Sequence, residues 1–336
     1  MMLADALRPE VPNNLHVLRL VAASAVVISH AWPLAQGAGT AEPLEALTGH
    51  SLGGWAVVVF FFLSGLLIAQ SAARRSAAAF WSARARRILP GLAGALAVTL
   101  ILAALSGGAV TGGVALDYLL RGITLVSLEH TIPKAFAANP MPGLVNGPLW
   151  SLFHEVAAYA VCFAAVRSGL MDRAPLGMIA LALALWGAVA MGLPGIPARV
   201  ATFAPLFLAF AVGMTAWRFA ARWPLTWPLV LLAVLLAPLG WPFAVLAVAQ
   251  VSLWLAFRTP AIRLGHDLSF GVYVYGWPVA QYIVHLVPGL NAPELAVLSL
   301  LATLPLAFAS WSLIERPALL GPGKPARKPA ATLTQV

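Results

Sequence analysis

The sequence predicts an all-α, polytopic integral membrane protein with about ten transmembrane helices and cytoplasmic N- and C-termini. Three observations support this prediction: 61% of residues are hydrophobic, only 9% are charged, and long apolar segments recur along the chain. A soluble domain has about 25% charged residues. We divide the chain into a membrane domain over residues 1–320 and a disordered, basic cytoplasmic tail over residues 321–336.

Ten segments approach the length of about 20 apolar residues that a helix needs to cross a bilayer. The seventh and eighth are short, and a proline- and glycine-containing sequence at 238–242 separates them, so they could form one broken pair. The predicted spans are residues 15–34, 52–72, 88–106, 148–167, 175–193, 200–220, 226–239, 241–257, 268–288 and 294–315.

The distribution of basic residues tests this count, because Lys and Arg collect in cytoplasmic loops. With the N-terminus inside, only Arg121, Lys134 and Arg199 fall on the outer side, which leaves 17 of the 20 basic residues inside. A count that is wrong by one span would mix the charges between the two sides. The net charge of +9 therefore reflects topology, and we expect no binding to nucleic acid.

Two connections are longer than the others. Residues 73–87 form a predicted cytoplasmic loop that is dense in arginine. The outer connection, 106–147, is rich in glycine and proline and contains an amphipathic stretch at 116–128, which we interpret as an interfacial helix or a lid over a site.

The first span contains Arg19 and His30, eleven residues apart. Eleven residues are about three helical turns, so the two side chains share a face and lie about 16 Å apart along the axis. Ionisable groups inside a membrane helix are costly and indicate a function by default. The alternative is that Arg19 extends to the interface and His30 ends the helix.

Glu155 lies within the fourth span, at a depth similar to that of His30. A carboxylate could orient the imidazole and raise its basicity. The alternative is a carboxylate that binds hydroxyl groups or Trp150. The single cysteine, Cys162, gives no disulfide and no cysteine cluster, so we expect no metal.

Two further patterns have a structural interpretation, and the second also has a functional one. Ser64 and Gly65 are most simply small residues against which another helix packs. Arg84 and Arg87 are three residues apart and share a helix face, so their guanidinium groups could bind a pyrophosphate. Arginine at this position is also the usual sign of a cytoplasmic helix end.

Together these residues resemble acyltransferase family 3, membrane acyltransferases that modify carbohydrates of bacterial surfaces. The resemblance covers nearly the whole chain. Its marks are Arg19 with His30, Phe60-Phe61-Phe62-Leu63-Ser64-Gly65, Arg84 to Pro90, Trp150-Ser151-Leu152 with Glu155 and Tyr159, Ser269-Phe270-Gly271-Val272-Tyr273 leading to Trp277-Pro278, and Ile314-Glu315-Arg316-Pro317. The chain departs from the pattern at Val58, where many members have aspartate, and at Gly276, where many have histidine.

The resemblance implies an O-acetyltransferase-like enzyme of the bacterial inner membrane. It would transfer an acyl group, commonly acetyl, from cytoplasmic acyl-CoA to a hydroxyl of a polysaccharide unit or lipid-linked glycan, with membrane lipid as a further partner. His30 would act as the base or accept the acyl group itself.

The resemblance also implies roles for the other matched residues. The donor would be bound by Arg84, Arg87, Arg86 and Ser64. Arg19 would hold the CoA arm of the donor, or its thioester, in place. Glu155 would orient His30 or bind the acceptor. Residues of the later motifs would line the acceptor site: Trp150, Ser151, Tyr159 and Tyr273.

A transporter or flippase of small polar solutes is the alternative function, because transporters also keep ionisable groups along a path. The sequence shows no paired, interrupted helices in matching halves, as internal repeats of a transporter would give.

Overall fold

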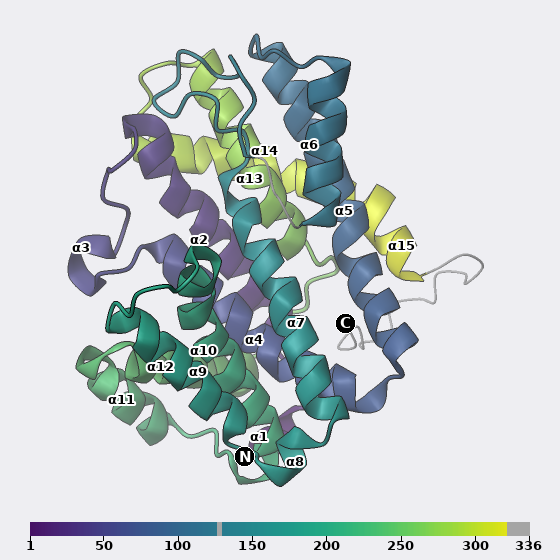
Figure 1. The fold of residues 1–336 in the computed structure, drawn as a ribbon, viewed down its shortest axis with the longest axis vertical. Coiled ribbons are helices and arrows are strands. Elements are labelled where there is room, and N and C mark those ends of the chain that lie inside the picture. Colours follow the sequence, from purple (N-terminus) through teal and green to yellow (C-terminus); the bar gives the residue numbers. More distant parts are fainter. Residues whose placement is uncertain (126–129, 321–336) are drawn as a thin grey trace.

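The computed structural model describes residues 1–125 and 130–320, which form helices and no strand. Within these ranges, seven helical segments are long and apolar enough to cross a membrane. They are α2 (Leu15–Gln36), α4 (Leu52–Arg74), α5 (Ala77–Leu105), the turn η1 (Gly147–Leu149) with α7 (Trp150–Arg167), α10 (Ala198–Arg218), α12 (Trp241–Arg258), and α14 (Ala292–Ser310) with its continuation through η4 (Trp311–Glu315) and α15 (Arg316–Leu320). Figure 1 shows α2, α4 and α7 side by side in the centre, with α10 and α12 grouped at the lower left.

The three remaining predicted spans are helical, but they are too short or not apolar enough to count among the seven candidate spans. The helices α9 (Gly177–Ala190) and α11 (Trp227–Leu236) are shorter than the bilayer requires, even with the turn η3 (Ala237–Leu239) added to α11. Helix α13 (Ser269–Leu286) has 18 residues but is less apolar than the seven. The structure thus supports an integral membrane protein with seven candidate spans, fewer than the ten predicted.

The predicted break between the seventh and eighth segments is confirmed. The turn η3 ends α11, and Gly240 follows with a φ of +138° before α12 begins. Only glycine adopts such a backbone angle without strain.

Helix α4 packs directly against α10 through glycine. A Cβ on Gly65 would lie 2.0 Å from the carbonyl oxygen of Phe210, and a Cβ on Gly213 would lie 2.2 Å from that of Phe62. The backbones of the two helices are therefore in contact, which confirms the predicted packing at Ser64 and Gly65.

The arginine-rich segment 73–87 is mostly helix, so its prediction as a loop is wrong. Helix α4 ends at Arg74, and α5 begins at Ala77 with the hydroxyl of Ser76 as its cap. Alanine and arginine are strong helix formers, and serine is a favoured cap. This segment therefore extends the membrane helix by about three turns.

The amphipathic stretch of the outer connection forms α6 (Gly112–Thr124). Tyr118 and Gly122 are buried on one side, whereas Leu116 and Leu120 are exposed on the other. This arrangement fits an interfacial helix. The end of the predicted stretch, 126–129, lies outside the described residues.

The residues after this gap pack onto α13. The Asn139 side-chain amide donates to the Gln281 side chain at 2.7 Å, and Gln281 Nε2 donates to the carbonyls of Met141 and Leu144. A buried amide with all these partners fixes the connection firmly on the helix.

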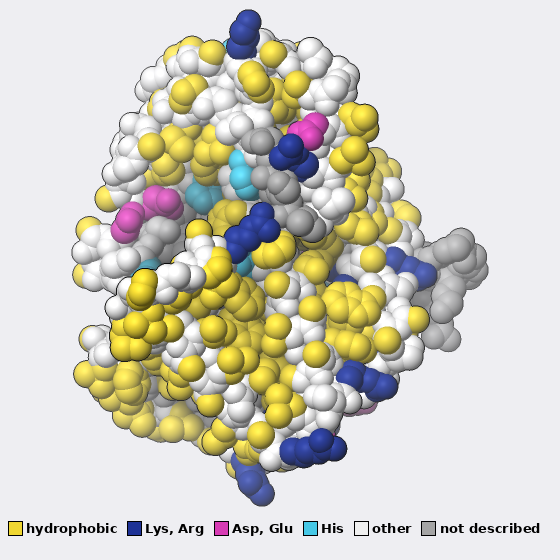
Figure 2. Space-filling model, viewed as in Figure 1, with side chains coloured by type: hydrophobic (Ala, Val, Ile, Leu, Met, Phe, Trp, Pro, Cys, Tyr) yellow, Lys and Arg dark blue, Asp and Glu magenta, His cyan; other side chains and the backbone are white. Residues whose placement is uncertain are grey.

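Four short helical turns complete the described chain: α1 (Leu3–Ala6), α3 (Glu45–Thr48), α8 (Leu170–Arg173) and η2 (Ala220–Arg222). Apolar side chains cover much of the lower half of the molecule, and basic side chains lie along its lower edge (Figure 2). An apolar belt with basic residues beyond it is what a bilayer requires. The predicted tail, 321–336, lies outside the described residues.

Candidate active site

Helix α2 presents Arg19 and His30 at different heights. No proline lies between them, because the single proline of the helix, Pro33, comes after His30. The helix is therefore continuous between them, and their Cα atoms are about 16 Å apart along its axis.

Arg19 lines a small cavity of about 30 Å³ between α2, α4, α5 and α7. Five predicted site residues meet in its wall: Arg19, Ser64, Arg84, Arg87 and Tyr159. Apolar side chains of α4, including Phe60 and Leu63, complete it. The sequence motifs thus converge on one place, although they are far apart along the chain.

Arg84 has an unusual environment in this cavity. Its side chain is buried, with a residue exposure of 5%, and its Nε and Nη2 atoms have no hydrogen-bond partner within residues 1–125 and 130–320. Its guanidinium group lies 5.9 Å from the centre of the Phe80 ring. An unpaired, buried cation is costly, and an anion bound in the cavity would offset this cost.

Arg87 lies on the same face of α5 and is also buried, whereas Arg86 is exposed. The predicted shared face of Arg84 and Arg87 is therefore confirmed, and Arg86 points away from the cavity. The guanidinium group of Arg87 forms an ion pair with Asp267 at 2.6 Å and lies 3.7 Å from Glu315.

Asp267 was not predicted as a site residue, and Glu315 entered only as part of a motif. The chain has just 11 acidic residues, and Asp267 directly precedes a predicted span. A carboxylate at the border of an apolar segment is a natural partner for a neighbouring arginine cluster, which is the signal that could have identified it.

Glu155 binds two residues of the cavity wall and not His30. Its Oε1 atom accepts hydrogen bonds from the hydroxyl of Ser64, at 3.2 Å, and from the hydroxyl of Tyr159 one turn further along α7. The predicted Glu155–His30 pair is therefore replaced by the alternative of hydroxyl partners. These side chains connect α7 with α4.

Two other predicted residues, Ser151 and Tyr273, bind each other. Their hydroxyl groups are 2.6 Å apart, and the Tyr273 hydroxyl also donates to the carbonyl of Pro148. The Tyr273 ring contacts Phe60 edge to face, with ring centres 5.8 Å apart. This pair joins α7 to α13 and supports the wall of the cavity, whereas Trp150 is 40% exposed.

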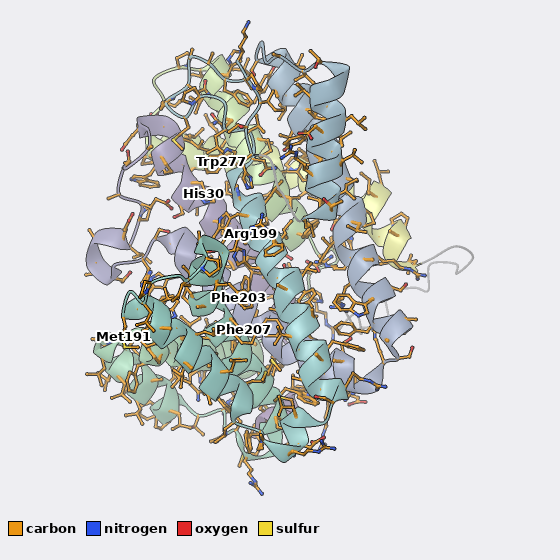
Figure 3. The ribbon with its side chains drawn as sticks, viewed as in Figure 1. His30, Met191, Arg199, Phe203, Phe207 and Trp277 are labelled. Atoms are coloured by element: carbon orange, nitrogen blue, oxygen red, sulfur yellow. The ribbon has the colours of Figure 1, made fainter. Side chains whose placement is uncertain are left out.

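His30 does not line this cavity and lies beside Trp277 (Figure 3). Its ring packs edge to face against Trp277 with ring centres 4.9 Å apart, and it has no hydrogen-bond partner among the described residues. The Trp277 indole donates to the carbonyl of Leu144, which fixes its orientation. The imidazole is therefore held by packing while its nitrogens stay available.

The departure at Gly276 has a packing explanation. A Cβ at this position would lie 2.4 Å from the side chain of Val27 on α2. Helices α2 and α13 approach too closely there for a histidine. The other departure, Val58, is a buried apolar residue.

No group of three or more His, Cys, Asp or Glu side chains that could hold a metal ion occurs in the described ranges.

Two comparisons with known proteins find matches over most of the chain. The sequence model of a family described as an acyltransferase domain, acyltransferase family 3, matches residues 13–312. An "O-acetyl transferase" of Shigella phage Sf6 is 27% identical over 326 residues, which cover 90% of this chain and 95% of the phage protein. No solved structure matches significantly.

Proposed function

The chain belongs to acyltransferase family 3 and is a membrane O-acyltransferase, and we propose that it moves an acetyl group from cytoplasmic acyl-CoA to a carbohydrate hydroxyl. The acceptor would be a unit of a surface polysaccharide or a lipid-linked glycan. The membrane would be a bacterial inner membrane, with both termini of the chain in the cytoplasm. The name of the phage relative supports acetyl as the group transferred.

The observation that carries the donor assignment is buried Arg84, which has unpaired nitrogens in the wall of a cavity shared with Arg19 and Arg87. Guanidinium groups bind phosphate oxygens strongly, often through two parallel hydrogen bonds. The phosphates of acyl-CoA supply such oxygens. Because the cavity holds only about 30 Å³, donor binding requires α5 to move away from α4, with which it makes few contacts.

The position of His30 supports its role as the base. It lies about 16 Å from Arg19 along α2, a distance that an extended pantetheine chain spans. The unpaired imidazole takes the proton from the acceptor hydroxyl, whose oxygen attacks the thioester carbonyl. The C–S bond then breaks, and the sulfur leaves with the proton as free CoA thiol.

The aromatic surroundings of His30 support a carbohydrate acceptor. Trp277 presents an indole beside the imidazole, with ring centres 4.9 Å apart. An aromatic ring can pack against the apolar face of a sugar. Membrane lipid would surround the site and deliver a lipid-linked acceptor.

The test is release of free thiol from acetyl-CoA by the purified protein, with and without a crude glycan fraction. We expect wild type to release thiol only with glycan, and His30→Ala to lose at least 100-fold in kcat, as removal of a general base does. His285→Ala, on α13, is the matched control and should keep the activity. Near-normal transfer by His30→Ala would refute the base assignment.

The same assay separates this proposal from a transporter, which would leave acetyl-CoA intact. No thiol release from folded protein with any glycan fraction would refute acyl-CoA as the donor.

A further inference from the structure

The two arginines of α5 differ in their partners. Arg87 donates from Nη2 to Asp267 Oδ2 at 2.6 Å, and both residues are buried, with exposures of 6% and 8%. Arg84, one turn away in the same cavity, makes no ion pair with a described residue. The guanidinium group of Arg87 is thus held by a carboxylate, whereas that of Arg84 makes no ion pair with a described residue.

Asp267 is itself firmly held. Its second oxygen, Oδ1, accepts from the hydroxyl of Ser269 at 2.7 Å and from the backbone N–H of Ser269 at 3.3 Å, in the first turn of α13. The imidazole of His16 lies 3.7 Å from Oδ2. Burial alone would raise the pKa of the Asp267 carboxyl, but the positive charges of Arg87 and Arg19 hold that pKa well below its usual range. Asp267 is therefore an ionised, fixed acceptor at neutral pH.

Arg87 still has unused donors. Its Nε and Nη1 atoms have no hydrogen-bond partner in the part of the chain that the structure describes, and its side chain lines the cavity. The second carboxylate, Glu315, is 3.7 Å from Nη1, which is too far for a hydrogen bond, and its Oε1 atom accepts from Ser310. Asp267 thus fixes one edge of the guanidinium group and leaves the rest available.

We propose that Asp267 is a positioning residue of the donor site, which holds the Arg87 guanidinium group so that its remaining N–H groups bind the anionic part of the donor. This inference rests on the proposed function, because it assumes that the cavity binds acyl-CoA phosphate. Asp267 acts on the donor through Arg87, whereas Arg84 binds without such support.

The test is a double-mutant cycle on the KM for acetyl-CoA. Asp267→Asn, which keeps the shape of the side chain, should raise this KM about tenfold with little change in kcat, because it loosens a contact to a non-reacting part of the donor. In an Arg87→Ala background the same substitution should have no further effect, because its target is gone.

Asp172→Asn is the matched control. It makes the same change in an exposed carboxylate, which pairs with Arg218 and does not line the cavity, so the KM should stay within about twofold of wild type. If Asp267→Asn does not fold, Asp267→Glu provides the same test, because it displaces the carboxylate and should give a smaller KM rise that also disappears with Arg87→Ala.

Two outcomes would overturn the inference. Additive effects of Asp267→Asn and Arg87→Ala would show that Asp267 does not act through Arg87. A KM raised by Arg84→Ala but unchanged by Arg87→Ala would remove Arg87 from the donor site and leave the proposed function intact. Failure of the proposed function itself would appear differently, as an unchanged KM in Arg84→Ala or no thiol release at all.

Discussion

Replacement of Arg84 by alanine is expected to raise the KM for acetyl-CoA by about 10- to 100-fold. Arg84 is buried with two unpaired nitrogens, and a hydrogen bond to a charged group contributes about 1.5–3 kcal/mol. Loss of one such contact corresponds to this range, since about 1.4 kcal/mol changes an equilibrium constant tenfold. The kcat should change little, because the phosphates do not react.

Arg86→Ala is the control for Arg84→Ala. Arg86 lies two residues away on the same helix and carries the same charge, but it is exposed and does not line the cavity. Its loss should leave the KM within about twofold of wild type, as exposed charges contribute little.

Acetyl-pantetheine provides a second control, because it lacks the phosphates of the donor. Wild type and Arg84→Ala should show the same KM for it. A KM rise that persists with acetyl-pantetheine, or that appears equally in Arg86→Ala, would refute phosphate binding by Arg84.

Misfolding cannot easily explain a raised KM for acetyl-CoA in Arg84→Ala. Arg84 has no ion-pair partner among the described residues, and an unpaired buried charge destabilises a fold. Arg84→Met should therefore keep or raise the apparent Tm in detergent while it weakens donor binding. Functional residues commonly show this opposition between stability and activity.

The remaining predictions concern stability. Gly65→Ala should lower the apparent Tm by about 5 °C or more, because its Cβ would lie 2.0 Å from a backbone oxygen of α10. The control, Gly187→Ala in α9, should be neutral or stabilising, because nothing lies within 4 Å of that position. Equal effects of the two substitutions on the Tm would contradict the close packing of α4 against α10. Because the folded-state pKa of Asp267 is lowered, the stability that its carboxylate adds is present above its ordinary pKa of about 3.9 and is lost as the pH falls through the folded value. The Tm difference between wild type and Asp267→Asn should thus narrow on acidification from pH 7 to about pH 3, whereas exposed Asp172→Asn should show no such change.

Apolar periodicity and residue type predicted the helices well. Each predicted span corresponds to a helix, and the break at Gly240 lies where proline and glycine indicate it. The lengths of the helices were less well predicted, because alanine and arginine extend α5 back to Ala77, beyond the apolar segment. Hydropathy measures where a helix is apolar, not where its hydrogen bonds begin.

Which residues meet in the cavity was also largely predictable. Arg19, Ser64 and Arg84 were identified from motifs, and the fold brings them to one cavity. Pairings between distant helices were not predictable, because similar depth in the membrane does not fix which faces meet. Glu155 therefore binds Ser64 and not His30, and Asp267 was missed because its partner, Arg87, is 180 residues away.

Under the proposed function, helix α2 fixes the distance between the anion site and the base. Arg19 and His30 lie on one uninterrupted helix, so backbone geometry sets their spacing of about 16 Å along the axis, and not loops or the acceptor. The proposed donor would then need its reactive carbonyl at about this distance from its negative charge. Acyl phosphates, in which the two are adjacent, would not reach both groups, whereas a carrier with a long flexible arm would. Acceptors could vary through changes around Trp277 without any change in the donor.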